Sequence, residues 1–183
     1  MSDKRIALVT GANQGVGLQV AKELVANGVT MLVGSRSFER GEAAATEIGS
    51  SAIPIQLDVR DRVSTAAVAE RIRKEFGRLD LLVQNAAISN TNRLPGQSVA
   101  DYAKTTRPSN VALDEVRAVW ETNVFGVLSV YHVMLPLLRE SSDARIVNVS
   151  SGVGSLTDNA NPPSAGARSS APSTLRPRRL STP

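Results

Sequence analysis

The chain has 183 residues, 42% of them hydrophobic and only 3% aromatic, so it is long enough for one domain with an aliphatic core. It contains no cysteine, which excludes disulfides and thiolate metal sites. The formal net charge is +4, but seventeen basic and seventeen acidic residues cancel within residues 1–163, and the excess comes from Arg168, Arg176, Arg178 and Arg179. We therefore expect no specific binding of nucleic acid by the folded part.

The start of the chain carries charge and then a short apolar run. The segment MSDKRIALVTG lacks the long apolar region of a secretory signal, and we expect no later stretch to be long enough to span a bilayer. These features predict a cytoplasmic protein without a membrane partner.

The first part of the chain alternates short apolar runs with helical segments. Strands are predicted at Arg5–Gly11, Val29–Ser35 and Ala52–Val59 because each is a compact apolar run of buried-strand character. A helix that stops at Asn27-Gly28 separates the first two strands, and a helix with an N-cap at Ser37 separates the next two.

The second part continues the alternation with longer connections. A helix capped by Asp61 leads to a fourth strand at Leu79–Asn85. The polar stretch Ser89–Asn110 contains two prolines and a glycine and is expected to be a loop. A long helix is predicted over Leu113–Leu138, bent or ended by Pro136, and the fifth strand is predicted at Arg145–Ser151.

This order of elements predicts the fold class. Strands that alternate with helices favour an α/β fold with a doubly wound, Rossmann-type parallel sheet, in which ligands bind beyond the carboxyl ends of the strands. We expect one such domain over residues 1–158 and a disordered tail rich in Pro, Ser and Arg over residues 159–183.

The sequence TGANQGVG, from Thr10 to Gly17, connects the first strand to the first helix. A phosphate needs close approach to the backbone and free N–H donors, which the start of a helix supplies. Gly11 permits a sharp turn, Gly15 lets a pyrophosphate approach and Gly17 lets helix and sheet pack closely. The motif therefore predicts a dinucleotide site.

The glycine spacing, TGxxxGxG, resembles that of the short-chain dehydrogenase/reductase family. The long Ser89–Asn110 stretch, together with the segment TGANQGVGLQVAKEL, resembles the carbonyl-reductase-like branch of that family. Further segments agree with that family in order and position. They are LDV at 57–59 (the adenine-contacting acid), QNAA at 84–87 (the NNAG motif), NVFG at 123–126 (the helix asparagine) and IVNVSS at 146–151 (the strand that ends in the catalytic serine).

The resemblance implies an enzyme that transfers hydride between a nicotinamide cofactor and a small carbonyl or alcohol substrate. It implies that Ser150 orients the substrate oxygen and that Asn123 holds a water in the proton path. The residues then expected to bind cofactor are Gly11, Asn13, Gln14, Gly15, Val16, Gly17, Arg36, Asp58, Val59, Asn85, Ala86 and Ala87.

Arg36 indicates which dinucleotide is bound. An acid after the second strand would bind the ribose 2′-hydroxyl of NAD, whereas an arginine accommodates the 2′-phosphate of NADP. Arg36 follows that strand in the sequence GSRS, so we expect NADP in preference to NAD. The alternative interpretation is an exposed arginine at a strand end.

The proton-transfer residues of the family are missing from the sequence. The family's tyrosine and lysine, spaced YxxxK, should follow Ser150, but the last tyrosine is Tyr131 and the last lysine is Lys104. Tyr102 with Lys104 offers no convincing substitute, and neither does Tyr131, which has no lysine four residues on, or His132. The last two strands of the family's sheet are also unrecognisable, as if the chain were truncated or altered in reading frame.

Two hypotheses follow. The chain is an NADP-dependent oxidoreductase, or it is a catalytically silent fragment that binds a nucleotide or a partner. For either hypothesis, the resemblance implies that the helix over 113–138 serves as a face for homo-oligomers.

Overall fold

The computed structural model describes residues 4–89, 94–105, 107 and 109–152. The chain divides into two units between Val149 and Ser150. The first unit contains all the helices and strands given below, and only residues 150–152 of the second are described. The predicted domain end at residue 158 and the predicted tail over 159–183 lie outside the described residues.

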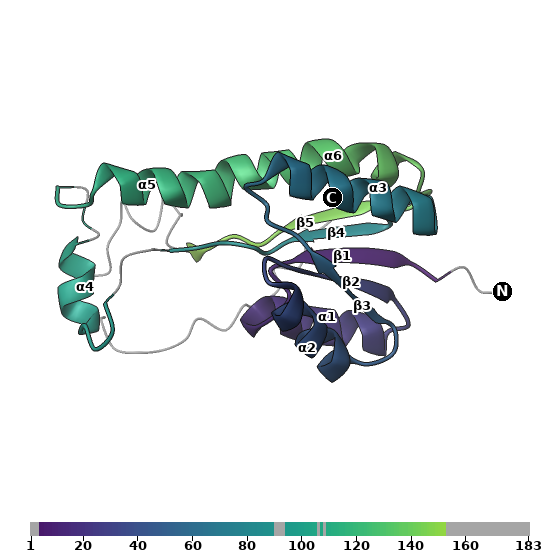
Figure 1. Ribbon diagram of the computed structural model, residues 1–183, viewed down its shortest axis with the longest axis horizontal. Coiled ribbons are helices and arrows are strands. Elements are labelled where there is room, and N and C mark those ends of the chain that lie inside the picture. Colours follow the sequence, from purple (N-terminus) through teal and green to yellow (C-terminus); the bar gives the residue numbers. More distant parts are fainter. Residues whose placement is uncertain (1–3, 90–93, 106, 108, 153–183) are drawn as a thin grey trace, which may run out of the picture. The chain divides into compact units, whose positions relative to one another are not determined.

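The elements alternate in the predicted manner (Figure 1). In chain order they are β1 (Ile6–Thr10), α1 (Gly15–Ala26), β2 (Thr30–Ser35), α2 (Phe38–Ile48), β3 (Ala52–Gln56), α3 (Arg62–Phe76), β4 (Leu81–Gln84), α4 (Val99–Thr105), α5 (Leu113–Trp120), the π-helical segment η1 (Glu121–Gly126), α6 (Val127–Arg139) and β5 (Arg145–Asn148).

The strands form one parallel sheet in the order β3-β2-β1-β4-β5. From β1 the chain first builds outward through β2 and β3, then returns to place β4 on the other side of β1. The strand order therefore switches between β1 and β4, the position at which doubly wound sheets bind ligands. The predicted Rossmann-type fold is confirmed.

Successive side chains of a strand point to opposite faces of the sheet, so the core is divided between the two faces. Ile6 and Leu8 of β1 lie in a cluster with side chains of α3 and α6, whereas Ala7 and Val9 lie in a cluster with side chains of α1 and α2. Figure 1 shows the two pairs of helices on opposite faces. Because both faces are covered, β1 is buried throughout, as its continuous apolar run predicts.

One predicted loop contains a helix. Within Ser89–Asn110 the structure has α4, so the expectation of a loop throughout is wrong. The Ser98 hydroxyl oxygen accepts from the Asp101 backbone N–H at 3.1 Å and donates to the Asp101 carboxylate at 2.8 Å. This Ser-x-x-Asp capping pair is visible in the sequence and could have revealed the helix.

The predicted long helix is a run of three segments, α5, η1 and α6. The π-helical turn η1 was not anticipated, since no sequence period marks an extra residue in one turn. The helix continues through Pro136 to Arg139, one residue past the predicted end, so of the two effects expected of this proline the structure excludes the one of ending the helix. Burial of Leu137 and Leu138 directly after the proline offsets the lost backbone hydrogen bond.

The run Leu113–Arg139 is, by length and composition, apolar enough to cross a membrane, which corrects the expectation that no such stretch exists. Its packing gives a different explanation. Val130, Met134 and Leu137 are buried in the core cluster between the sheet and α3. We therefore interpret the α6 part of the run as a core helix of a folded domain.

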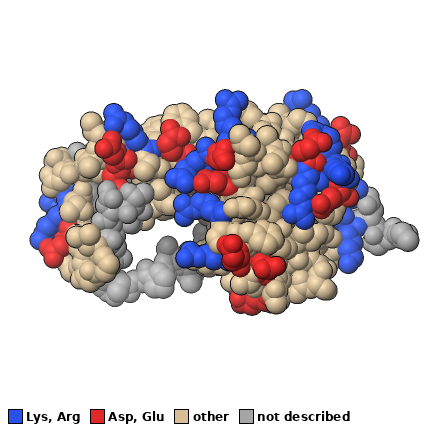
Figure 2. Space-filling view, viewed as in Figure 1, with Lys and Arg blue, Asp and Glu red and all other residues tan. Residues whose placement is uncertain are grey.

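Charged side chains of both signs are interspersed over the face shown in Figure 2. Exposed ion pairs within one helix include Arg71 with Glu75 and Arg73 with Glu70. Such pairs stabilise the fold by at most about 1 kcal/mol each. The face shown has no extended patch of one sign.

Candidate functional site

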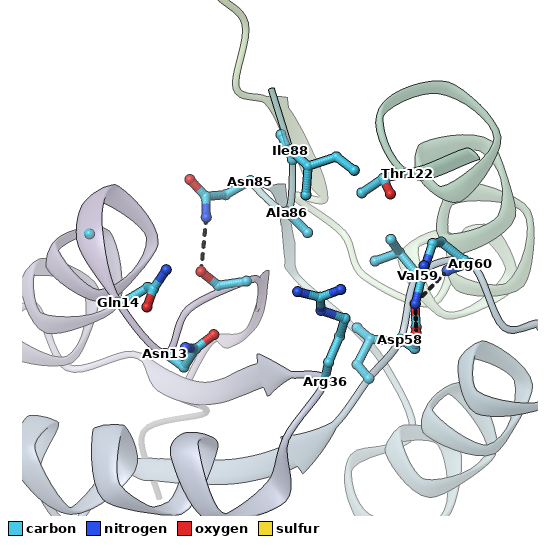
Figure 3. Close-up of a pocket in the computed structure, with 14 residues that line it drawn as sticks. Asn13, Gln14, Arg36, Asp58, Val59, Arg60, Asn85, Ala86, Ile88 and Thr122 are labelled. Atoms are coloured by element: carbon cyan, nitrogen blue, oxygen red, sulfur yellow. Dashed lines mark hydrogen bonds and ion pairs between the residues drawn. The ribbon is translucent and has the colours of Figure 1, made fainter. Parts of the chain in front are cut away.

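A cavity of about 230 Å³ opens at the carboxyl ends of the first four strands, where the strand order switches (Figure 3). Its walls include ten of the twelve predicted cofactor residues: Gly11, Asn13, Gln14, Gly15, Arg36, Asp58, Val59, Asn85, Ala86 and Ala87. Four further lining residues were not predicted: Leu57, Arg60, Ile88 and Thr122. Val16 and Gly17 are not among the lining residues.

The glycine turn has the backbone geometry that close approach of a ligand requires. Gly11 and Gly15 have φ angles of 64° and 58°, in the left-handed region that favours glycine. A Cβ on Gly15 would meet no atom within 4 Å, whereas a Cβ on Gly17 would lie 2.4 Å from Nδ2 of Asn85. Gly15 therefore faces open space, and Gly17 packs the start of α1 against the end of β4.

The start of α1 differs from the starts of the next two helices. The side chain of Ser37 accepts a hydrogen bond from the first turn of α2, and Asp61 does the same for α3. At α1 the N-cap residue Gln14 makes no side-chain cap within the described chain, and the first turn has no acidic residue. The first N–H groups of α1 and its positive dipole end thus lack a side-chain acceptor at the cavity.

Hydrogen bonds join the turn after β1 to the turn after β4. The Thr10 hydroxyl oxygen accepts from the backbone N–H groups of Asn85 and Ala86, both at 3.0 Å. The Asn85 side-chain amide donates to the carbonyl oxygens of Thr10 and Gly11 at 3.1 and 3.0 Å. The Asn85 side chain therefore fixes the shape of the glycine turn (Figure 3).

Arg36 extends into the cavity from the end of β2 (Figure 3). Its guanidinium makes no hydrogen bond or ion pair with any residue that the structure describes. The backbone N–H of Leu57 donates to the carbonyl of Ser35 at 2.8 Å, which brings the chain after β3 beside Arg36. Arg36 is thus a cation at the cavity wall with its whole donor edge free for an anion.

Asp58 is held by Arg60, two residues later. The Asp58 carboxylate accepts from Nε and Nη2 of Arg60 at 3.1 and 2.8 Å, and from the Arg60 backbone N–H at 3.0 Å. The Arg60 side chain, with a smaller effect from the charge of Arg36, holds the pKa of Asp58 below its ordinary value. The sequence LDVRD contains this pair. The spacing of two residues between Asp58 and Arg60 could have suggested that their side chains interact.

Asn123, from η1, does not line the cavity, although its neighbour Thr122 does. The Asn123 side chain accepts from the Ile88 backbone N–H at 2.9 Å and donates to the Ile88 carbonyl at 2.8 Å. A Cβ on Gly126 would lie 2.8 Å from a methyl of Val59, so this glycine lets the helix approach the cavity wall. Asn123 therefore joins the helix to the chain that leaves β4.

A family model described as short chain dehydrogenase matches residues 5–165. The chain belongs to this family. It is 38% identical over 175 residues to short-chain dehydrogenase/reductase 1 of Saponaria officinalis, covering 85% of this chain and 56% of the relative. It is 35% identical over 183 residues to (-)-isopiperitenone reductase of Mentha piperita, covering 84% of this chain and 58% of the relative.

Solved structures of short-chain dehydrogenases agree with the fold. Menthone neomenthol reductase of Mentha piperita has a TM-score of 0.72 at 33% identity, with 83% of this chain and 62% of that chain covered. Salutaridine reductase of Papaver somniferum has a TM-score of 0.71 at 30% identity, with 84% and 60% covered. The chain thus spans somewhat more than half the length of these relatives.

The catalytic residues expected of a short-chain dehydrogenase are only partly placed. Ser150 begins the second unit of the chain, so its predicted role stays a prediction. Of the weighed substitutes, Lys104 lies on α4 and donates to Asp101 at 2.8 Å. The rings of Tyr131 and His132, on α6, lie 6.0 Å apart. Tyr102 and Lys104 lie on the same helix but two residues apart, not four apart as in YxxxK, and the Tyr131–His132 pair contains no lysine.

Proposed function

We propose that the cavity binds NADP(H) for hydride transfer between the nicotinamide and a carbonyl or alcohol carbon of a small substrate. The observation that carries this proposal is the uncapped start of α1 beside the open space at Gly15. An anion at this position would complete the helix, because free N–H groups and the helix dipole favour negative charge there. A pyrophosphate has the charge and size that the turn accommodates.

The other cavity residues fit the rest of the dinucleotide. Arg36 has a free planar donor edge for a 2′-phosphate, which supports NADP over NAD. Asp58 and Val59 line the same end and suit the adenine. Ala86 and Ala87 line the cavity with small side chains, which leave room for the adenosine side of the cofactor. When bound, the cofactor supplies or accepts the hydride, and the chain's own residues position it.

Proton transfer separates two candidate functions. A tyrosine phenol ordinarily titrates near pKa ~10 and needs a nearby cation to work at neutral pH. The sequence holds no tyrosine after Tyr131 and no lysine after Lys104. This supports a second candidate, a chain that binds NADP(H) without turnover, since loss of a general acid typically slows a reaction by about 10²–10⁴.

One experiment separates these candidates. NADPH binding to the 183-residue chain is measured by calorimetry. NADPH oxidation is then measured with each of a panel of small ketones and aldehydes as substrate. Turnover that is abolished by Ser150→Ala would support the oxidoreductase, and binding without turnover would support the silent nucleotide-binding chain. If NADPH and NADH both fail to bind, both candidates are wrong.

Self-association through the run from α5 to α6 is part of the proposal. Trp120, Phe125 and Leu128 on this run are each about half exposed, more than soluble surfaces usually present together. Light scattering after gel filtration would contradict this element of the proposal if it gave the monomer mass at high concentration. A cytoplasmic location stays a prediction.

A further inference from the structure

We infer that Arg60 is a specificity-determining residue for NADP(H). By pairing with the Asp58 carboxylate, it keeps the Arg36 guanidinium free for the 2′-phosphate. This inference rests on the proposed function. Arg60 would act through its neighbours, as a positioning residue, and would not need to touch the phosphate.

The first argument is the contrast between the two arginines of the cavity. Both line its wall, but only Arg60 has a carboxylate partner. Arg60 presents its Nε and Nη2 donors to the two oxygens of Asp58, the fork geometry that binds a carboxylate best. Arg36 makes no ion pair in the described part of the chain.

The second argument is the closeness of Arg36 to the same carboxylate. Arg36 and Asp58 line not only the 230 Å³ cavity but also a neighbouring cavity of about 590 Å³. Arg36 follows β2 and Asp58 follows β3. These two parallel strands are paired up to Ser35 and Gln56, so they end side by side. The charge of Arg36 also contributes to the lowered pKa of Asp58, although less than the Arg60 side chain does.

These contacts imply competition for one acceptor. Asp58 has no other basic partner in the described chain, and its backbone is fixed by a hydrogen bond from its N–H to the Ser64 hydroxyl at 3.0 Å. With Arg60 present, the carboxylate is neutralised and the net charge of the three side chains is +1. Without Arg60, Arg36 becomes the nearest cation to an unpaired carboxylate, and their pairing would withdraw it from a phosphate.

The position of Arg60 supports a role at the site rather than in the core. Its side chain is about half exposed and lines both the cofactor cavity and the groove between α3 and the η1–α6 helix. Glu121 on η1 adds a second, weaker negative charge near it, and together with Asp58 keeps the pKa of Arg60 above its ordinary value. Arg60 therefore stays charged and in place over Asp58.

The test compares dissociation constants for NADPH and NADH in the full chain and its variants. Arg60→Ala should weaken NADPH binding about tenfold, the loss of one charged hydrogen bond, and change NADH binding less than about threefold. The double variant Arg60→Ala with Asp58→Asn removes the competing charge but keeps a carbonyl oxygen for the adenine. It should recover NADPH binding to within about threefold of the wild type.

Arg62→Ala is the matched control, since Arg62 carries the same charge two residues later and does not line the cofactor cavity. It should leave both dissociation constants unchanged. An unchanged far-UV circular dichroism spectrum shows that each variant is folded. If Arg60→Ala keeps the wild-type preference, or if the double variant is as weak as Arg60→Ala, this inference is wrong. If the wild type itself shows no preference for NADPH, the proposal for Arg36 fails and this inference falls with it.

Discussion

Asn123 and Ile88 are joined by two reciprocal hydrogen bonds, 2.9 Å from the Ile88 N–H to the Asn123 amide oxygen and 2.8 Å from the Asn123 amide nitrogen to the Ile88 carbonyl. One side chain of the π-helical segment thus satisfies both backbone groups of a residue that leaves β4 at the cavity. The pair links the helix that covers the sheet to the wall of the proposed cofactor site.

Replacement of Asn123 by Ala should therefore destabilise the whole domain. It leaves the partly buried N–H and C=O of Ile88 without their partner, which costs about 1–3 kcal/mol. Urea unfolding would measure this loss. Asn110→Ala, at an exposed amide that donates to the Lys104 carbonyl, serves as control and should change the unfolding free energy by less than about 0.5 kcal/mol.

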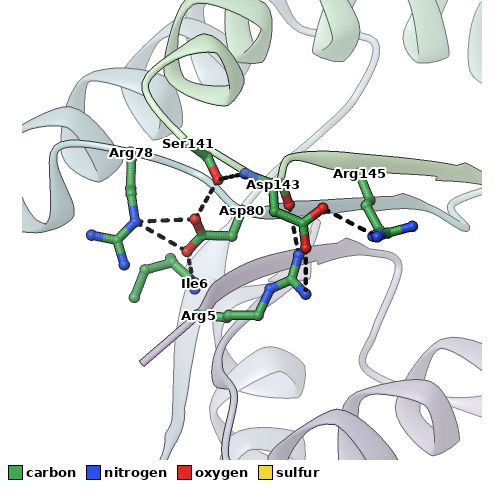
Figure 4. Close-up of polar contacts among 7 residues, drawn as sticks. All are labelled: Arg5, Ile6, Arg78, Asp80, Ser141, Asp143 and Arg145. Carbon is green, nitrogen blue, oxygen red and sulfur yellow. Dashed lines mark hydrogen bonds and ion pairs between the residues drawn. The ribbon is translucent and has the colours of Figure 1, made fainter. Parts of the chain in front are cut away.

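Asp80 is the centre of a second polar cluster, at the amino ends of β1 and β4 (Figure 4). It is only 6% exposed and accepts hydrogen bonds from the Ile6 N–H at 2.7 Å, the Ser141 hydroxyl at 2.6 Å and Nε of Arg78 at 3.0 Å. Burial raises the pKa of Asp80, but the hydrogen bonds from Ser141, Ile6 and Arg78 outweigh it and leave the pKa below its ordinary value.

Asp80→Asn should cost roughly 3 kcal/mol at neutral pH, because it removes the negative charge that pairs with Arg78 and turns an NH2 donor toward groups that are themselves donors. Because the pKa of Asp80 is lower in the folded chain, its stabilisation is present above the unfolded carboxyl pKa of about 3.9 and is lost as the pH falls through the folded pKa.

Urea unfolding between about pH 5 and 3 would check this, since the variant should lose less stability on acidification than the wild type. Asp143→Asn, in an exposed pair with Arg5 and Arg145, should cost under about 1 kcal/mol. If the unfolding free energies of Asp80→Asn and the wild type fell equally as the pH was lowered, the account of Asp80 would be contradicted.

Gly15→Ala should remove dinucleotide binding while the fold persists. The φ angle of 58° makes a side chain cost about 1 kcal/mol, and the new methyl would occupy the open space beside the α1 N-terminus. Calorimetry should show NADPH binding weakened by at least about tenfold. Gly28→Ala carries the same backbone strain, with φ 81° and open space, but lies away from the cavity and should bind NADPH normally.

Gly17→Ala should act on stability instead. Its Cβ would lie 2.4 Å from the Asn85 amide and 2.5 Å from the Gly11 carbonyl, in the contact that fixes the glycine turn. Overpacking of this kind typically costs about 1–3 kcal/mol. Thermal unfolding of the unliganded variant would measure the cost, and a midpoint equal to that of the wild type would show that α1 can shift to make room.

Sequence patterns predicted most of this architecture because local rules agree with the tertiary structure there. Apolar runs set all five strands, and Ser37 and Asp61 cap the helices that they were predicted to cap. The glycine turn could be predicted because its glycines have distinct steric roles. Gly11 and Gly15 have positive φ angles, and Gly17 allows close packing. The π-helical segment could not be predicted, since no sequence period marks it, and its Asn123 contacts Ile88 across a separation of 35 residues.

The cavity was predicted in large part, for a similar reason. Its residues follow directly after strands, so strand ends alone bring Gly11, Arg36 and Asp58 together. Thr122 was missed because it comes from a helix that reaches the cavity only through the packing of Gly126 on Val59. Arg60 was missed because no motif marks it, although its spacing of two residues from Asp58 allows the pairing that the structure shows.

Thermal unfolding with and without nucleotide tests the central claim most directly, namely that the start of α1 binds a dinucleotide. At about one hundred times the dissociation constant, NADPH should stabilise the chain by about 2.7 kcal/mol and raise the unfolding midpoint by roughly 5–10 °C, more than NADH at the same concentration. An unchanged midpoint with millimolar NADPH and with NADH would contradict the account.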